Sequence, residues 1–101
     1  MARKIPPTHP GEVLLEEFMK PFGLSANALA TDLGLPATRI GDIIHRRRGV
    51  TPETGIALAE YFGTSVEFWL GVQMQYDRET AEDEIGLQVR KRVRRRELVA
   101  N

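Results

Sequence analysis

The apolar and polar positions between Leu24 and Gly49 have the spacing of two short helices separated by a tight turn. Ser25 can cap the first helix, because its side chain can accept a hydrogen bond from an otherwise unpaired backbone N–H. Gly34 can end that helix in the left-handed conformation, and Pro36 can occupy the first position of the next helix, where its missing N–H costs nothing. The pattern therefore predicts a helix-turn-helix unit.

The two predicted helices have an inward and an outward face. The inward positions are apolar or small, and they are Ala28, Leu29, Ala30, Leu33, Leu35, Ile40, Ile43 and Ile44. The outward positions of the second helix and the turn after it are Ala37, Thr38, Arg39, Gly41, Asp42, His45, Arg46, Arg47 and Arg48. In such a unit the second helix lies in the major groove of DNA, so these outward side chains are candidates for contacts with bases and phosphates.

A further helix is predicted before this unit, from Pro10 or Gly11 to Lys20. Pro21 ends it, because proline lacks the backbone donor that a helix interior needs. Its apolar stripe consists of Val13, Leu14, Leu15, Phe18 and Met19. We expect this helix to support the helix-turn-helix unit.

Two helices are predicted directly after the unit. The sequence Thr-Pro-Glu at residues 51–53 is typical of a helix start, and Gly63 ends this helix. Its apolar positions are Ile56, Ala57, Leu58, Ala59, Tyr61 and Phe62. Thr64 or Ser65 caps the next helix, which runs from residue 66 to about residue 76. Its apolar side chains face the core or a second subunit, and they are Phe68, Trp69, Val72 and either Met74 or Tyr76.

The last helix is predicted over residues 78–97. Acidic side chains dominate its first half and basic side chains its second half, the order that the helix dipole favours. Ile85, Val89 and Val93 recur every four residues, although Gly86 costs about 1 kcal/mol relative to alanine. Every predicted element is a helix, so the predicted fold class is all-α.

Length and composition argue against an enzyme. A chain of 101 residues fits one domain and has little room for a substrate cavity with its own supporting shell. The sequence has no nucleophile-plus-base spacing and no glycine-rich phosphate loop.

The chain has no cysteine, which excludes disulfides and thiolate metal sites and fits a reducing compartment. His9 and His45 are the only histidines, and no carboxylate pattern beside them suggests a metal site, so we expect neither a metal nor a cofactor. No apolar run has the length of a signal peptide or a membrane span. We therefore expect a cytoplasmic protein without membrane contact.

Charge is balanced overall but unevenly distributed. The chain has 14 basic and 14 acidic residues. Between Arg39 and Arg48 four arginines face a single acid, Asp42, and between Arg90 and Arg96 six basic side chains occur with no acid among them. The first run follows the predicted recognition helix and fits phosphate binding. The second run has three interpretations: a solvated helix end, a nonspecific nucleic-acid tail, or a surface for an acidic partner.

Motifs over about residues 8 to 84 give the chain a family resemblance. They are HPGE at 9–12, EEF at 16–18, LGLPATRI at 33–40, RGVTPETGIALAEYFGTSVEFWLGVQ at 48–73 and YDRETAE at 76–82. With these motifs the chain resembles the phage-repressor-like (Xre/Cro) helix-turn-helix family, and within it the HigA-type, VapI-like, antitoxin branch. The resemblance implies a five-helix phage-repressor-like domain with an additional C-terminal helix.

We expect three parts along the chain. Residues 1–10 form an extended arm with Arg3 and Lys4, which is either a flexible end or an arm that touches DNA phosphates or a partner. Residues 11–76 form the helix-turn-helix DNA-binding domain. Residues 77–101 form the C-terminal helix and basic tail.

The predicted DNA-binding residues have distinct roles. The full set is Ser25, Asn27, Ala37, Thr38, Arg39, Asp42, His45, Arg46, Arg47 and Arg48. Arg39 is the best candidate to read a base, because its fork of donors matches the two acceptors of guanine. Thr38 can bond a base or a phosphate, Asn27 is either a phosphate or adenine contact or a solvent-facing residue, and residues 46–48 fit phosphate.

One helix-turn-helix unit reads few base pairs, so we expect a homodimer on a palindromic operator, with the apolar stripe of the last two helices as its interface. The resemblance implies that the dimer represses its own operon and captures a cognate HigB/RelE-like toxin, a small mRNA-cleaving nuclease. The toxin could bind the arm with the first helix, or the final helix. Two alternatives remain: a stand-alone repressor without a toxin, and a protein that neutralises a partner without useful DNA binding.

Overall fold

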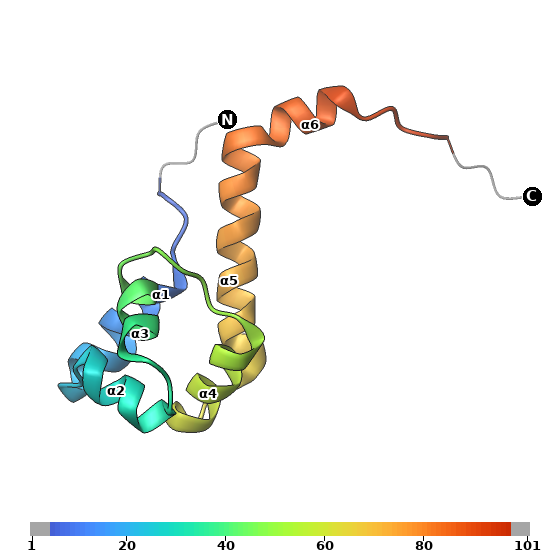
Figure 1. Cartoon of the computed structure of the whole chain (residues 1–101). Coiled ribbons are helices and arrows are strands. Elements are labelled where there is room, and N and C mark those ends of the chain that lie inside the picture. The colour runs from blue at the N-terminus through green and yellow to red at the C-terminus, as the bar shows by residue number, and fades with distance from the viewer. Residues whose placement is uncertain (1–4, 98–101) are drawn as a thin grey trace, which may run out of the picture.

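Helices make up all the regular secondary structure of residues 5–97, the part of the chain that this computed structural model describes (Figure 1). The first helix, α1 (Pro10–Val13), continues into a π-helical segment, η1 (Leu14–Met19), and a 3-10 turn, η2 (Lys20–Phe22). Then follow α2 (Ala26–Leu33), α3 (Ala37–Ile44), α4 (Pro52–Phe62) and α5 (Val66–Ala81). A second π-helical segment, η3 (Glu82–Gly86), joins α5 to α6 (Leu87–Arg92). The predicted fold class is confirmed.

Most helix starts and ends lie where the sequence predicts them. The side chains of Ser25, Thr51 and Ser65 each accept a hydrogen bond from a backbone N–H three residues later, at 3.1, 3.4 and 3.0 Å. Gly34 and Gly63 follow α2 and α4 with φ of +70° and +72°. Glycine adopts this left-handed conformation without steric cost, so both helices end at these positions.

Pro36 lies one position earlier than predicted. Its backbone is extended, with φ −61° and ψ 143°, and its carbonyl accepts a bond from the N–H of Arg39 at 2.9 Å. An extended residue whose carbonyl takes the first helical bond is an N-cap. Pro36 therefore precedes α3, which begins at Ala37.

The core surrounds Trp69 of α5, which is fully buried. Its ring centroid lies 5.0 Å from that of Phe18, and its indole N–H donates to Thr64 Oγ1 at 2.8 Å. Other fully buried side chains come from η1, α2, α3 and α4, and they include Leu14, Met19, Leu29, Ile40, Ile43 and Leu58. These are apolar positions of the predicted helices, so the inward face of α3 is as predicted.

Several apolar positions of the predicted helices are exposed, among them Ala28, Ile56, Tyr61, Phe68, Met74, Ile85 and Val93. In α4 the close contact with α5 is made at Gly55, where a Cβ would lie 3.3 Å from Leu70 Cδ2. Successive residues of a helix point about 100° apart. The contact at Gly55 therefore turns Ile56, which is 58% exposed, toward solvent.

Helix α5 is longer than predicted, because it continues past Tyr76 to Ala81. Two side-chain hydrogen bonds between residues four apart support this extension: Gln73 Nε2 to Asp77 Oδ1 at 2.9 Å and Gln75 Nε2 to Glu79 Oε2 at 3.2 Å. Pairs four residues apart stabilise a helix by a few tenths of a kcal/mol each, roughly 0.2–0.5. Figure 1 shows that α5 rises past the body of the protein and that α6 turns away from it.

The C-terminal helix ends earlier than predicted, at Arg92 rather than Glu97. Basic side chains four residues apart repel each other in a helix, and a helix through residue 96 would hold three such pairs, formed by residues 90, 91 and 92 with 94, 95 and 96. This repulsion outweighs the favourable dipole at the helix end. Val93 is accordingly extended, with ψ 131°.

The predicted division of the chain stays a prediction. Residues 5–9 reach α1 without regular secondary structure, while Arg3 and Lys4 lie outside the described residues. The boundary expected between residues 76 and 77 falls inside α5. No helix of residues 5–97 is long and apolar enough to cross a membrane.

Candidate nucleic-acid interface

Helices α2 and α3 form the predicted helix-turn-helix unit. The turn between them is closed by a bond from the N–H of Leu35 to the carbonyl of Ala30 at 2.9 Å. Ala30 is buried and has no long side chain, and Ile40 and Ile43 fill the space between α3 and the core. The outward side of α3 is thereby left to polar and small residues.

The structure exposes most of the predicted contact residues. Those whose residues are exposed are Ser25, Asn27, Ala37, Thr38, His45, Arg46, Arg47 and Arg48. Arg39 and Asp42 are only partly exposed, with side-chain exposures of 23% and 30%. The set thus lies on α2, α3 and the segment of residues 45–48, which we call the basic turn.

Three of the four arginines of α3 and the basic turn face a carboxylate of the protein itself. Arg47 pairs with Asp42 at 3.0 Å, Arg46 with Glu12 at 2.7 Å, and Arg39 with Glu53 at 3.5 Å. Exposed pairs of this kind contribute at most about 1 kcal/mol, so a phosphate can replace the carboxylate at little cost. Sequence reasoning missed Glu12 and Glu53, because both come from other helices.

The basic turn has a fixed backbone. Its N–H groups bond back to α3, from Arg46 to the carbonyl of Ile43 at 3.0 Å and from Arg47 to that of Asp42 at 2.8 Å. This is a Schellman closure, in which the residue after the helix is left-handed. Arg46 holds that position with φ +64°, where glycine is the usual residue. A side chain that occupies such a position despite its steric cost points to a role for the guanidinium.

His45 and Asp42 are engaged within the unit. The Nδ1 atom of His45 lies 2.8 Å from the carbonyl oxygen of Gly41, a distance at which an Nδ1–H donates to it. Asp42 holds Arg47. In this arrangement both side chains form hydrogen bonds at the surface, to the backbone of α3 and to an arginine of the basic turn.

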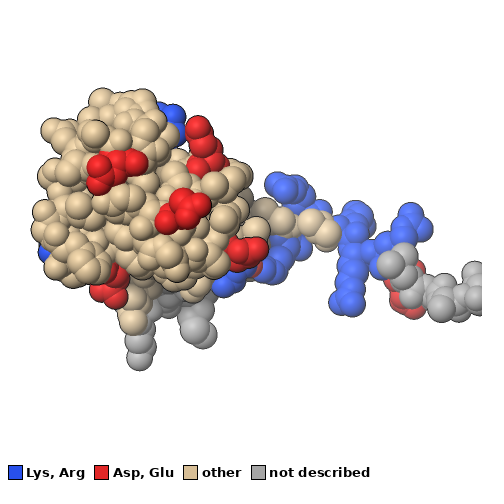
Figure 2. All heavy atoms as spheres, turned by 90° about the horizontal axis from the view of Figure 1, so that it is seen from below, with Lys and Arg blue, Asp and Glu red and all other residues tan. Residues whose placement is uncertain are grey.

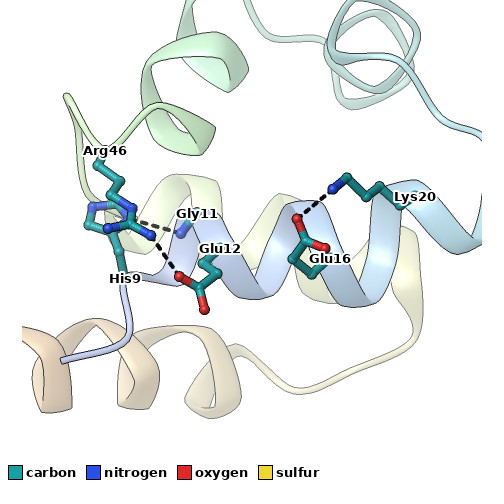
Figure 3. Close-up of polar contacts among 6 residues, drawn as sticks. All are labelled: His9, Gly11, Glu12, Glu16, Lys20 and Arg46. Carbon is teal, nitrogen blue, oxygen red and sulfur yellow. Dashed lines mark hydrogen bonds and ion pairs between the residues drawn. The ribbon is translucent and has the colours of Figure 1, made fainter. Parts of the chain in front are cut away.

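The start of α1 fixes the end of α3, a feature that sequence reasoning did not identify (Figure 3). His9 caps α1, with its Nδ1 accepting from the N–H of Gly11 at 2.9 Å, and its ring meets that of Tyr76 edge-on at 4.8 Å. A Cβ at Gly11 would lie 1.9 Å from the carbonyl oxygen of Ile43. With the Glu12–Arg46 pair, residues 9–12 form what we call the N-terminal clamp. A histidine N-cap followed by Pro10 at the helix start was its available signal.

Because His9 of the N-terminal clamp caps α1 and is buried in its neutral form, we expect the protein to lose stability at mildly acidic pH. Burial of the ring is the main cause that holds the pKa of His9 below its ordinary value, the charge of Arg46 adds to this, and Asp77 opposes it. The folded state thus binds a proton less readily than the unfolded chain, where His titrates near about 6.5. The contribution of neutral His9 to the free energy of unfolding is therefore fully present above that pH. It falls as the pH drops below that value, by at most about 1.4 kcal/mol per pH unit.

The measurement is the free energy of unfolding between pH 7.5 and 5.5, for the wild type and for His9→Asn. Asparagine is a good N-cap and does not titrate, so this variant keeps the cap while removing the proton. We expect a clearly steeper decline in the wild type. Equal slopes for the two proteins would contradict a neutral, capping His9.

Among residues 5–97, most of the positive charge gathers in two regions, the basic turn with Arg39 and the C-terminal segment after α5, while Lys20 and Arg78 lie apart from both. Figure 2 shows the molecule from below, with Asp and Glu spread over the body and Lys and Arg at its edges and along the projecting C-terminal segment. In that segment Arg90 bonds both carboxylate oxygens of Glu82, at 2.6 and 2.5 Å. No group of three or more potential metal ligands occurs within residues 5–97. The candidate interface is therefore the outward side of α2 and α3 with the basic turn.

Comparison with known proteins agrees with this geometry. Residues 15–69 match the family described as helix-turn-helix. Virulence-associated protein I of Dichelobacter nodosus is 44% identical over 81 residues, which cover 80% of this chain and 75% of that protein.

Two solved structures are similar over most of their length. One is Pseudomonas aeruginosa antitoxin HigA with the higBA promoter, with a TM-score of 0.85 and 38% identity, covering 87% of this chain and 96% of that one. The other is antitoxin GraA in complex with its operator, with a TM-score of 0.87 and 39% identity, covering 99% of each chain. In both cases the similar protein was solved with DNA.

Proposed function

Because this chain belongs to the helix-turn-helix family, with HigA antitoxins as structural neighbours, we propose that it is an antitoxin that binds operator DNA through α3 and represses its own toxin–antitoxin operon. The family is one of DNA-binding regulators and not a class of enzymes. The observation that carries the proposal is the exposed start of α3, with Ala37 and Thr38 at the surface, together with the exposed arginines of the basic turn that follows the same helix.

In this proposal some side chains contact bases and so select the sequence, and others contact the phosphate backbone of the DNA. Arg39 contacts Glu53 through Nη1, which leaves its other donors available for the two acceptors of a guanine. Thr38 and Ala37 contact neighbouring bases, and Ser25 and Asn27 at the start of α2 contact the backbone. The arginines of the basic turn exchange Glu12 and Asp42 for phosphates.

A homodimer would place two copies of α3 on a palindromic operator, about one helical turn of DNA apart. Exposed apolar side chains on the projecting C-terminal segment support an interface there: Ile85, Leu87 and Val93 are 48%, 68% and 59% exposed. The proposal includes neutralisation of a RelE-like mRNA-cleaving toxin, which rests on the similarity to antitoxins.

Substitution of two arginines tests DNA recognition. Arg39→Ala is expected to lower the preference for DNA upstream of the gene over a scrambled duplex by 1 to 3 kcal/mol, roughly 5- to 150-fold. Arg47→Ala is expected to weaken both duplexes alike and to reduce the slope of log K against log salt by about 1. Binding is measured by fluorescence anisotropy over a salt series.

Arg78→Ala is the matched control, because Arg78 is an exposed arginine on α5, 3.8 Å from Glu79. It should leave both duplexes unaffected. Equal effects of Arg39→Ala and Arg47→Ala on specific and scrambled DNA would refute recognition through α3.

The toxin is tested by co-purification of the tagged protein with the product of the adjacent small reading frame. A stable complex that also binds the upstream DNA supports an antitoxin. Specific DNA binding without a partner would instead identify a stand-alone repressor.

A further inference from the structure

One side chain of α5 is bonded to the backbone that leaves the basic turn. Gln73 Oε1 accepts a hydrogen bond from the N–H of Val50 at 2.6 Å, and Gln73 Nε2 donates to Asp77 Oδ1 at 2.9 Å. Val50 is 4% exposed and belongs to the core. The amide of Gln73 is thus fixed at both ends, by α5 on one side and by the chain after the basic turn on the other.

The approach of Gln73 depends on a glycine beside it. A Cβ at Gly49 would lie 2.6 Å from Gln73 Oε1 and 2.8 Å from its Cδ. Gly49 has no positive φ, so close approach rather than backbone conformation explains a glycine here. Gly49 and Val50 follow the three arginines directly, and Gln73 therefore determines where the chain leaves the basic turn.

The entry and the exit of the basic turn are held by different groups. At the entry, the carbonyl of Asp42 accepts from the N–H groups of Arg47 and Arg48 at 2.8 and 3.2 Å. At the exit, the first backbone N–H held by a side chain is that of Val50, through Gln73. A turn held at both ends fixes the backbone from which its guanidinium groups extend, which lowers the entropy lost when they bind phosphate.

We propose that Gln73 is a positioning residue for DNA binding, which holds residues 49–50 against α5 and so places the arginines of the basic turn for contact with phosphates. The proposal rests on the proposed function and names a residue outside the helix-turn-helix unit that acts on it. Gln73 itself is not expected to touch DNA.

The test is Gln73→Met, which keeps an unbranched side chain and removes both hydrogen bonds. Each phosphate contact contributes about 0.9 to the slope of log K against log salt. We expect Gln73→Met to reduce that slope by about 1 to 2 and to weaken binding to upstream and scrambled DNA alike, on the order of tenfold at moderate salt. Preference between the two duplexes should be unchanged.

Gln75→Met is the matched control. Gln75 is exposed on the same helix and donates only along that helix, to Glu79 at 3.2 Å. It should leave the salt slope at the wild-type value. The double variant Gln73→Glu with Asp77→Asn is the conservative rescue. Its new carboxylate at position 73 can accept from the N–H of Val50, and its new amide at position 77 can donate to that carboxylate. We expect the double variant to recover the wild-type slope.

The salt slope separates positioning from general destabilisation, since a partly unfolded population lowers the apparent affinity without changing the slope of the folded molecules. A wild-type slope in Gln73→Met would overturn the inference while leaving the proposed function intact. Absence of salt-dependent DNA binding by the wild type would instead refute the proposed function, and this inference with it.

Discussion

Replacing Gly11 by alanine is expected to lower the free energy of unfolding by roughly 3 kcal/mol, the upper end of the usual range for overpacking. The added Cβ would lie 1.9 Å from the carbonyl oxygen of Ile43 and 2.7 Å from its carbonyl carbon. Both are backbone atoms near the end of α3, and backbone cannot yield by changing a rotamer. Either α1 or α3 must therefore move, and with it the Glu12–Arg46 pair.

Gly71→Ala is the matched control for this prediction. Gly71 lies inside α5, and nothing is within 4 Å of a Cβ built there. Alanine favours a helix over glycine by about 1 kcal/mol, so this variant should be as stable as the wild type or more stable. Denaturant unfolding followed by circular dichroism measures both. A Gly11→Ala protein with wild-type stability and wild-type DNA binding would contradict the clamp.

The contrast between predicted and missed features follows from sequence distance. The caps and breaks of α2 and α3 could be predicted because Ser25 and Gly34 act on their own helix within a few residues. Gly11 could not be understood in this way, since the atom that excludes a side chain there belongs to Ile43, far along the chain. A glycine beside a proline has the same local appearance whether it forms a turn or a close packing contact.

The candidate interface shows the same division. The arginines of the basic turn could be predicted from their spacing after the recognition helix, but their carboxylate partners Glu12 and Glu53 come from α1 and α4. The role of Gln73 could not be predicted either, because its hydrogen bond joins α5 to Val50, 23 residues earlier in the chain. The predicted end of the last helix was wrong for a local reason. The helix dipole favours basic side chains near the C-terminal end of a helix, but basic side chains four residues apart also repel each other, and the prediction neglected this repulsion.

Replacing Trp69 by alanine is expected to lower the free energy of unfolding by 3 to 5 kcal/mol, roughly the cost of removing a large buried ring. Trp69 is fully buried, and its ring centroid lies 5.0 Å from those of Phe18 and Phe68 and 6.4 Å from that of Phe62. These rings come from three separate helical segments. The cavity would thus open where η1, α4 and α5 meet, and few side chains there can move to fill it.

Two smaller changes separate the ring from its hydrogen bond. Trp69→Phe keeps an aromatic ring but removes the donor to Thr64 Oγ1, whereas Thr64→Val leaves the buried indole N–H without its acceptor. An unpaired buried donor costs about 1 to 3 kcal/mol, so Thr64→Val should destabilise the wild type more than it destabilises the Trp69→Phe protein. Unfolding must be followed by far-UV circular dichroism, because Trp69 is the only tryptophan. Additive effects would show that the bond contributes nothing.

Trp69 and Gln73 are one turn apart on α5 and point to the same side of that helix. Loss of the ring should therefore loosen the turn of α5 from which Gln73 reaches Val50. We expect Trp69→Ala to reduce the salt slope of DNA binding as well as stability, measured at a temperature where the variant is still folded. Trp69→Phe keeps most of the packing and should retain the slope, so the two variants distinguish anchoring of α5 from the hydrogen bond to Thr64.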